Sequence, residues 1–144
     1  MSFDRSPFLR VAMPTSHKSP LPNVPYTRTD IQAMVGGELQ TYLPQKNKVI
    51  LAGCFTKGDM NPEAPNVVQV GNVPKVVAKA VLLSQQPETV FPVFVKLRQS
   101  EKTYRFCGNY RFQSLSDDPN EIRAAEHASG RKGQLAFVLR LSSA

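Results

Sequence analysis

The spacing of apolar residues changes several times along the chain, and each change marks an expected element. Alternating apolar and polar positions predict a strand, whereas apolar residues three or four positions apart predict a helix. The expected strands are 48–55, 67–70, 91–98, 104–113 and 134–142, and the expected helices are 27–34, 74–86 and 118–129. Glycine and proline make the segment 56–66 a predicted loop.

Capping residues define the ends of the predicted helices. Threonine and aspartate accept hydrogen bonds from the free N–H groups at a helix start, proline suits the first turn, and glycine ends a helix. These signals are Thr27 or Thr29, Gly36, Gly37, Pro74, Asp118, Pro119 and Gly130.

The segment after residue 103 has the clearest strand pattern. Aromatic residues occupy its even positions and polar residues its odd positions: Tyr104, Phe106, Tyr110 and Phe112 against Arg105, Arg111 and Gln113. Because alternate side chains of a strand point to opposite faces, one aromatic face is expected. Gly108 predicts a bulge or a bend.

The order of the elements favours an α+β fold. A short turn over 99–102 joins two of the strands, so these two are expected to form a hairpin. The arrangement that fits best is a small, curved, mostly antiparallel β-barrel with two or three helices at its rim. A doubly wound parallel sheet is excluded, because its crossovers are missing. Residues 1–25 contain five of the twelve prolines and are expected to be a flexible arm, followed by a single domain over 26–144.

Composition excludes several classes of protein. The chain has 144 residues, 41% of them hydrophobic and 20% charged, as in globular proteins. No apolar run approaches the 20 or so residues of a membrane span, and the N-terminus lacks the apolar core of a secretory signal. Cys54 and Cys107 are the two cysteines, too few for a disulfide scaffold or a four-cysteine zinc site. We expect a reducing, cytoplasmic location, with nucleoid association in a bacterium.

The net charge of +7 points to a polyanionic partner. Nucleic acid is the commonest one, although small proteins are also basic for solubility alone. Five cations stand within sixteen residues against Glu101: Lys96, Arg98, Lys102, Arg105 and Arg111. If the hairpin forms, several of them share one exposed ribbon.

No catalytic signature accompanies this charge. The chain has no phosphate-binding glycine loop, no nucleophile elbow and no helical pair of metal-binding histidines. A nucleophilic pair of Cys54 or Cys107 with His127 stays open, but cysteines in strands are usually core residues. Asp59 and Glu63 share a loop without completing a nuclease metal motif. We therefore expect no enzyme, no cofactor and no metal.

Short elements of the sequence resemble, in order, the SRA-like domains of the PUA superfamily, including those of modification-dependent restriction endonucleases. The resemblance covers about residues 26 to 115. It rests on Gly36-Gly37 with Gln40, the strand 49–55, Gly58-Asp59-Met60-Asn61, Pro92-Val93-Phe94-Val95-Lys96, and Tyr104-x-Phe106-x-Gly108-x-Tyr110-Arg111. The Tyr-Asp-Gly signature of the eukaryotic branch is missing.

The resemblance implies a curved barrel that flips a modified base of double-stranded DNA into a pocket and stacks it between aromatic rings. By analogy, the stacking candidates are Tyr42 or Phe55 and Tyr104 or Tyr110. Asp59 and Asn61 are candidates for reading the edge of the base.

The leading hypothesis is therefore a non-catalytic nucleic-acid-binding module that reads a modified base in DNA, with any cleavage left to a nuclease partner. An RNA-binding version stays open. The alternative is a protein-interaction or small-ligand-binding barrel, in which the arm and the loop 61–65 make the contacts and the basic charge is incidental. A small hydrolase that uses Cys54 or Cys107 is the third hypothesis.

Overall fold

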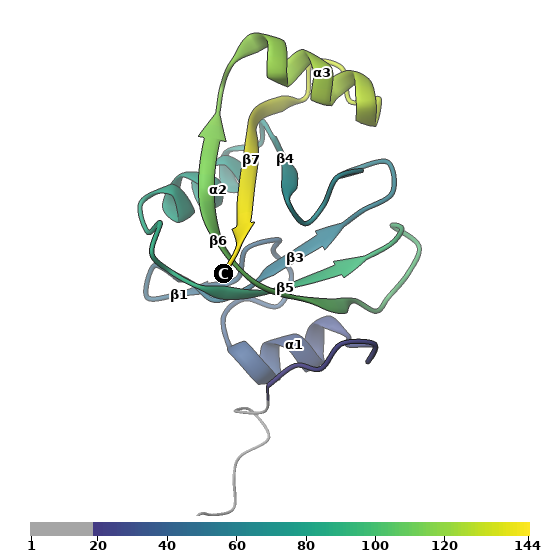
Figure 1. Ribbon diagram of the computed structural model, residues 1–144, viewed down its shortest axis with the longest axis vertical. Helices are drawn as coiled ribbons and strands as arrows, with labels where there is room; N and C mark the ends of the chain where they lie inside the picture. The colour runs from purple at the N-terminus through teal and green to yellow at the C-terminus, as the bar shows by residue number, and fades with distance from the viewer. Residues whose placement is uncertain (1–18) are drawn as a thin grey trace, which may run out of the picture.

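A five-stranded mixed sheet forms the centre of the molecule (Figure 1). The computed structural model describes residues 19–144, so residues 1–18 of the predicted arm lie outside the described residues. The strand order is β3-β5-β6-β7-β4, with β3 parallel to β5 and the other three pairs antiparallel. The strands are β3 Gly53–Thr56, β4 Val67–Gly71, β5 Phe91–Lys96, β6 Arg105–Ser116 and β7 Leu135–Ser143. The α+β class is confirmed.

The three helices begin where their capping residues predict, and the first and third end at their predicted glycines, whereas the second ends two residues before its predicted end at residue 86. They are α1 Arg28–Val35, α2 Pro74–Ser84 and α3 Pro119–Ser129. The Thr27 hydroxyl accepts from the Asp30 N–H, and the Asp30 carboxylate accepts from the Thr27 N–H, which makes a capping box. Asp118 caps α3 at the Glu121 N–H, and Gly130 ends it with a φ of 69°. These ends are local signals, so the sequence alone is enough to find them.

The predicted continuous strand 48–55 is wrong. The chain instead forms a separate two-stranded hairpin, β1 Gln45–Lys46 and β2 Val49–Ile50, before β3 joins the main sheet. The Leu51 N–H donates to the Pro44 carbonyl at 2.8 Å, which closes the hairpin and turns the chain. The segment is rich in β-forming residues, as predicted, but these residues lie in two different sheets.

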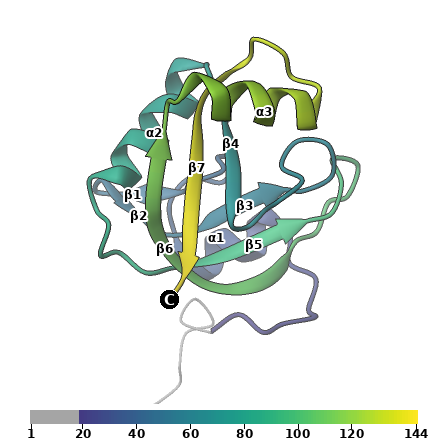
Figure 2. The same cartoon turned by 45° about the horizontal axis from the view of Figure 1, so that its top comes forward.

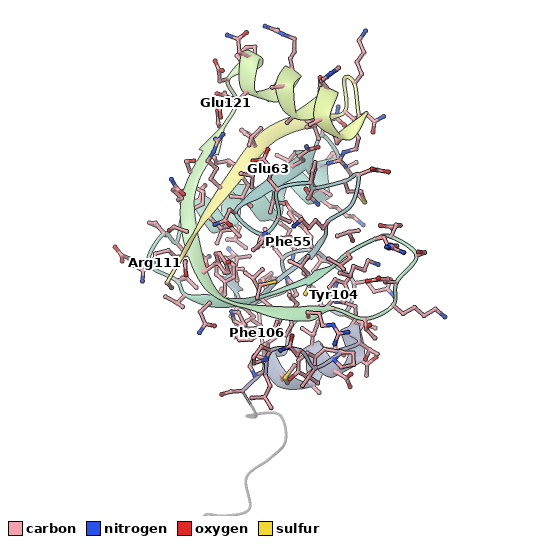
Figure 3. All side chains as sticks on the ribbon, turned by 45° about the vertical axis from the view of Figure 1, so that its right-hand side comes forward. Phe55, Glu63, Tyr104, Phe106, Arg111 and Glu121 are labelled. Carbon is pink, nitrogen blue, oxygen red and sulfur yellow. The ribbon has the colours of Figure 1, made fainter. Side chains whose placement is uncertain are left out.

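Two hydrophobic clusters lie on opposite sides of the sheet. The first contains Phe55, Val68 and Leu139 and is covered by α2, whereas the second contains Phe94 and Ile31 of α1. Figure 3 shows Phe106 on the α1 side of the sheet and Phe55 on the other side. The helices α1 and α2 therefore pack on opposite faces.

Gly108 makes β6 change faces, so the predicted single aromatic face is wrong. The register shifts at this point, because Val93 pairs with Gly108 and Phe94 with Phe106. One residue of β6 is left over, which is a β-bulge. Tyr104 and Phe106 consequently pack in the α1 cluster, whereas Tyr110 and Phe112 pack in the α2 cluster. The sequence pattern located the bulge but did not show that it reverses the alternation.

The side chain of Asn61 joins the two edge strands of the sheet. Its Nδ2 donates to the Thr56 carbonyl of β3 at 2.9 Å, and its Oδ1 accepts from the Gln69 N–H of β4 at 2.7 Å. No ladder pairs β3 with β4 in the described residues. In a closed barrel, backbone hydrogen bonds join the two edge strands. Here the side-chain amide of one residue joins them.

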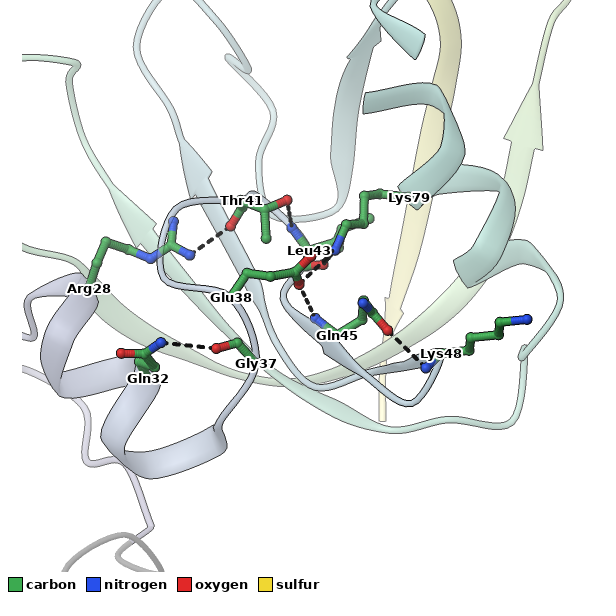
Figure 4. Close-up of polar contacts among 9 residues, drawn as sticks. All are labelled: Arg28, Gln32, Gly37, Glu38, Thr41, Leu43, Gln45, Lys48 and Lys79. Carbon is green, nitrogen blue, oxygen red and sulfur yellow. Dashed lines mark hydrogen bonds and ion pairs between the residues drawn. The ribbon is translucent and has the colours of Figure 1, made fainter. Parts of the chain in front are cut away.

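A second polar group ties α1, the β1–β2 hairpin and α2 together (Figure 4). The Glu38 carboxylate accepts from Lys79 Nζ at 2.6 and 2.7 Å and from the Gln45 N–H at 2.8 Å. Burial raises the pKa of Glu38, but the bonds from Lys79 and Gln45 outweigh this effect and lower it. Arg28 donates to the Thr41 carbonyl at 2.7 Å, which holds the same segment against α1.

Residues 19–25 of the predicted arm contact the domain. Tyr26 exchanges two backbone hydrogen bonds with Tyr104, just before β6, and its hydroxyl accepts from the Leu21 N–H at 2.7 Å. The Asn23 carbonyl accepts from Arg105 at 3.1 Å. None of the helices in residues 19–144 combines the length and apolar composition that a bilayer crossing requires.

The closing contact of Asn61 can be tested by Asn61→Ala. The variant leaves the Thr56 carbonyl and the Gln69 N–H without their partner, so we expect a loss of about 2–4 kcal/mol in the free energy of unfolding. Urea denaturation measures it. Asn66→Ala in the same loop is the control, because the Asn66 side chain is exposed and makes one long bond of 3.5 Å. Equal unfolding midpoints for the two variants would contradict the assigned role.

The bulge can be tested by Gly108→Ala. The φ of Gly108 is 124°, and a Cβ at this position would stand 3.8 Å from the nearest atom, the Tyr110 Cε1, so the cost is conformational and not steric. We expect a loss of about 1–3 kcal/mol. The control is Gly71→Ala, which has no positive φ and a similar 3.8 Å contact. An unchanged melting temperature of Gly108→Ala would mean that the bulge needs no glycine.

Candidate nucleic-acid interface

Five cations gather at one end of the sheet, and we call them the hairpin cluster: Lys57, Lys96, Arg98, Lys102 and Arg105. Four come from the β5–β6 hairpin, and Lys57 comes from the loop after β3. Parallel pairing sets Thr56 opposite Lys96, and the Lys57 N–H donates to the Lys96 carbonyl at 2.8 Å. The two connections therefore meet at the same corner of the sheet.

Glycine lets the two connections approach closely. A Cβ on Gly58 would stand 3.1 Å from the Leu97 carbonyl oxygen and 3.7 Å from the Arg98 Cα, and the φ of Gly58 is 52°. Leu97, at the turn, is 58% exposed. The corner thus presents an exposed apolar side chain among cations from two segments.

The cations of the hairpin cluster differ in how firmly they are held. Lys96 Nζ donates to the carbonyls of Gln99 at 3.4 Å and Glu101 at 3.2 Å and lies 5.4 Å from the centre of the Tyr104 ring. Arg105 is bonded to the Asn23 carbonyl. Arg98 and Lys102 are exposed and have no hydrogen-bond partner for their side chains among residues 19–144. Two of the cations are therefore oriented by backbone carbonyls, and two are free to reach a ligand.

The charge of the hairpin cluster is not neutralised within the described part of the chain. The salt bridges there are Lys79–Glu38 and Arg140–Glu121, both distant from this corner in the fold. The nearby Glu101 carboxylate accepts from the Leu97 N–H at 3.2 Å, and Asp59 is exposed. Five cations against two carboxylates leave a positive field at the corner.

Arg111 does not belong to this cluster, so four of the five cations near Glu101 share the hairpin. Arg111 pairs with Ser142 of β7, whereas Arg105 pairs with Val95 of β5. Figure 3 shows Arg111 and Tyr104 at opposite sides of the lower sheet. The β6 strand is long enough to pair with both neighbours, and this carries Arg111 away from the hairpin.

The four aromatic stacking candidates lie in the interior or at its edge. Phe55 is 2% exposed, and Tyr104 and Tyr110 are buried in different clusters. Tyr42 is half-buried, its hydroxyl donates to the Val76 carbonyl, and burial raises its pKa. Tyr42 and Phe55 form a tilted pair with ring centroids 6.5 Å apart in the cluster that also contains Tyr110, whereas Tyr104 lies in the other cluster; Phe55 has no free face for a base.

The two candidates for base reading are placed differently from each other. Asp59 is exposed and lies beside Lys57 in the chain, so its carboxylate is accessible. Asn61 is 7% exposed, and both polar atoms of its side chain are bonded within the fold. Its amide is therefore structural in this conformation.

The cysteines lie apart from one another. Cys54 is buried, and burial raises the pKa of its thiol to about 11, against the opposing effect of Arg28. Cys107 is exposed as a residue, but partial covering of its thiol raises its pKa, and Lys57 acts in the opposite direction. His127 is on α3. In residues 19–144 no three of the histidine, cysteine and acidic side chains are grouped as metal ligands would be.

Comparisons with protein-family models, with curated proteins and with solved structures found no match. The resemblance to SRA-like domains therefore stays a prediction from the sequence.

Lys57 was not predicted from the sequence as a member of the hairpin cluster. Lys57 is 39 residues from Lys96, and only the parallel pairing of β3 with β5 brings them together. The apolar run 49–55 indicated a strand but carried no information about its partner. The four cations of the hairpin were found because a short turn keeps them close in sequence and in space.

The approach of Lys57 to Cys107 can be tested by alkylation. Lys57 lowers the pKa of the Cys107 thiol, so Lys57→Gln raises it further and reduces the thiolate fraction. We expect iodoacetamide to modify Cys107 about twofold more slowly at pH 8, as measured by mass spectrometry of its peptide. Lys48→Gln, at the β1–β2 hairpin, should leave the rate unchanged. Identical rates in all three proteins would show that Lys57 does not face this corner.

Proposed function

We propose that this protein is a nucleic-acid-binding module whose phosphate contacts come from the hairpin cluster. The observation that carries the proposal is the assembly of five cations from two separate segments at one corner, with no ion pair to any of them among residues 19–144. Cations without ion pairs among residues 19–144 attract a polyanion, and each phosphate that they neutralise releases counterions.

The donors of the corner suit phosphate oxygens. A lysine ammonium has three N–H donors and an arginine guanidinium has five, so Lys96 and Arg105 keep free donors after bonding to backbone carbonyls. Those bonds reduce the side-chain entropy that binding must remove. Arg98 and Lys102 supply the accessible charge, and Leu97, directly before Arg98 in the chain, is exposed.

Double-stranded DNA is the proposed partner, and the reading of a modified base stays a prediction that rests on the resemblance. The buried positions of Phe55, Tyr104 and Tyr110 do not favour stacking by those rings. Phosphate binding is thus the part of the hypothesis that the geometry supports.

Fluorescence anisotropy with a 20-base-pair duplex at several salt concentrations tests the proposal. Three phosphate contacts give a slope of log K against log salt of about −2.7. The triple variant Lys57→Gln, Arg98→Gln, Lys102→Gln should lose most of this slope. The matched control is Lys46→Gln, Lys48→Gln, Lys75→Gln, which removes the same charge from exposed positions elsewhere.

A flat salt response of the native protein, or equal losses in the two triple variants, would contradict binding through the hairpin cluster. Duplexes with cytosine, 5-methylcytosine or N6-methyladenine at one position, and a matched RNA, extend the same titration. A tenfold preference, about 1.4 kcal/mol, would support base reading. Equal binding to all would confine recognition to phosphates.

A further inference from the structure

A cavity of about 180 Å³ lies between α3 and the outer face of the sheet. Figure 2 shows α3 crossing in front of β4 and β7. The helix turns Ala124, Ala125 and Ala128 toward the cavity, and no residue of α3 is buried. Methyl side chains at these positions are too short to fill the space against the sheet, so the helix covers the cavity without packing into it.

Three polar contacts between α3 and the strands keep the helix separated from the sheet. At its start, Glu121 forms a salt bridge of 2.6 Å with Arg140 of β7. At its middle, the Gln69 side chain of β4 donates to the Ala125 carbonyl at 3.0 Å. Near its end, Glu126 accepts from the Leu135 N–H at 3.2 Å. Because these three contacts fix the helix, the cavity is present before a ligand binds.

The lining of the cavity is mixed: six of its ten residues are apolar, and the other four are Glu63, Gln69, Glu121 and Arg140. Val67 and Val138 of the sheet face the three alanines, and Pro62 closes one side. Gln69 lines the cavity and is 8% exposed. Its amide nitrogen has two N–H groups, and only the one bonded to Ala125 has an acceptor among residues 19–144. The cavity therefore offers a buried hydrogen-bond donor.

Among the charged side chains that line the cavity, the one without a partner in residues 19–144 is negative; Arg131, which is not part of the lining, donates to the Gln69 Oε1 at 3.4 Å. Glu121 is neutralised by Arg140 and also accepts from the Ser116 hydroxyl at 2.7 Å. Glu63 lines the cavity too, and its carboxylate has no cation or donor within bonding distance in the described residues. Figure 3 shows Glu63 and Glu121 at the α3 end of the molecule. A ligand here meets one unpaired carboxylate.

We propose that this cavity binds a small aromatic cation, which has one six-membered ring, a protonated amine at one end and a hydrogen-bond acceptor at the other. The volume exceeds the roughly 150 Å³ that accommodates a benzene ring in an engineered apolar cavity. The ring contacts the alanines and valines, the amine pairs with Glu63, and the acceptor takes the second N–H of Gln69. None of these residues belongs to the hairpin cluster, so the two sites use different side chains.

The probe for the test is 4-(aminomethyl)pyridine, which carries the amine and a ring nitrogen at opposite ends. Titration of the full ¹⁵N-labelled chain at pH 8 should give saturable shifts at the Gln69 side-chain amide and at Ala125, with a dissociation constant of about 1 mM. Benzylamine, which lacks the ring nitrogen, and benzyl alcohol, which lacks the charge, should bind more weakly.

Two variants and two matched controls complete the test. Ala125→Leu fills the cavity and should abolish the shifts, whereas Ala78→Leu at an exposed position of α2 should not. Glu63→Gln should weaken binding of the amine about threefold to fivefold and leave benzyl alcohol unaffected, and the exposed Glu88→Gln should change neither.

Three results would overturn the proposal. They are the absence of saturable shifts up to 10 mM probe (about tenfold above the expected constant), undiminished binding in Ala125→Leu, and benzyl alcohol that binds as tightly as the amines. The last result would mean that the cavity binds apolar ligands without recognising their charge.

Discussion

The bridge that Asn61 makes between β3 and β4 is the contact on which both candidate sites depend. Two hydrogen bonds of 2.9 and 2.7 Å fix the middle of the loop 57–66 against the two edge strands. The loop begins with Lys57 at the hairpin cluster and continues through Pro62 and Glu63 to the cavity under α3. Because the amide is 7% exposed, water competes little for its bonds, and losing them leaves two polar groups unsatisfied. One side chain thus positions two surfaces on different sides of the molecule.

The bulge at Gly108 is the second constraint, because it lets one strand contribute side chains to both hydrophobic clusters. Before the bulge, β6 turns its aromatic side chains toward α1, and after it toward α2. The change of face places Arg105 on the side of the sheet occupied by Val95, near Lys57 and Cys107. Without it, the alternation would continue and Arg105 and Arg111 would share a face. The bulge therefore separates Arg105 from Arg111, and only Arg105 stays with the hairpin cluster.

Local signals in the sequence predicted the order of the three helices and of the strands of the main sheet, and most of their ends, but not the β1–β2 hairpin. Thr27, Asp118 and Gly130 act within one or two helical turns, so the residues that determine the outcome are neighbours in the sequence. The cations of the hairpin were found for the same reason. Non-local contacts were not predictable in this way. Lys57 joins the cluster because β3 pairs in parallel with β5, and two other elements lie between these strands in the sequence. Asn61 is of a residue type that is usually exposed in loops, but in the structure it is buried and bridges two strands.

Nucleic acid is proposed to contact the corner where the loop after β3 meets the β5–β6 hairpin. The most direct measurement is a ¹⁵N–¹H NMR titration of the full chain with a short DNA duplex. We expect the resonances of the backbone amides of residues 57–60 and 96–105 to shift first and most, and those of the β1–β2 hairpin to stay unchanged. Shifts centred on the β1–β2 hairpin or on α3, with the corner unmoved, would contradict the proposed contact.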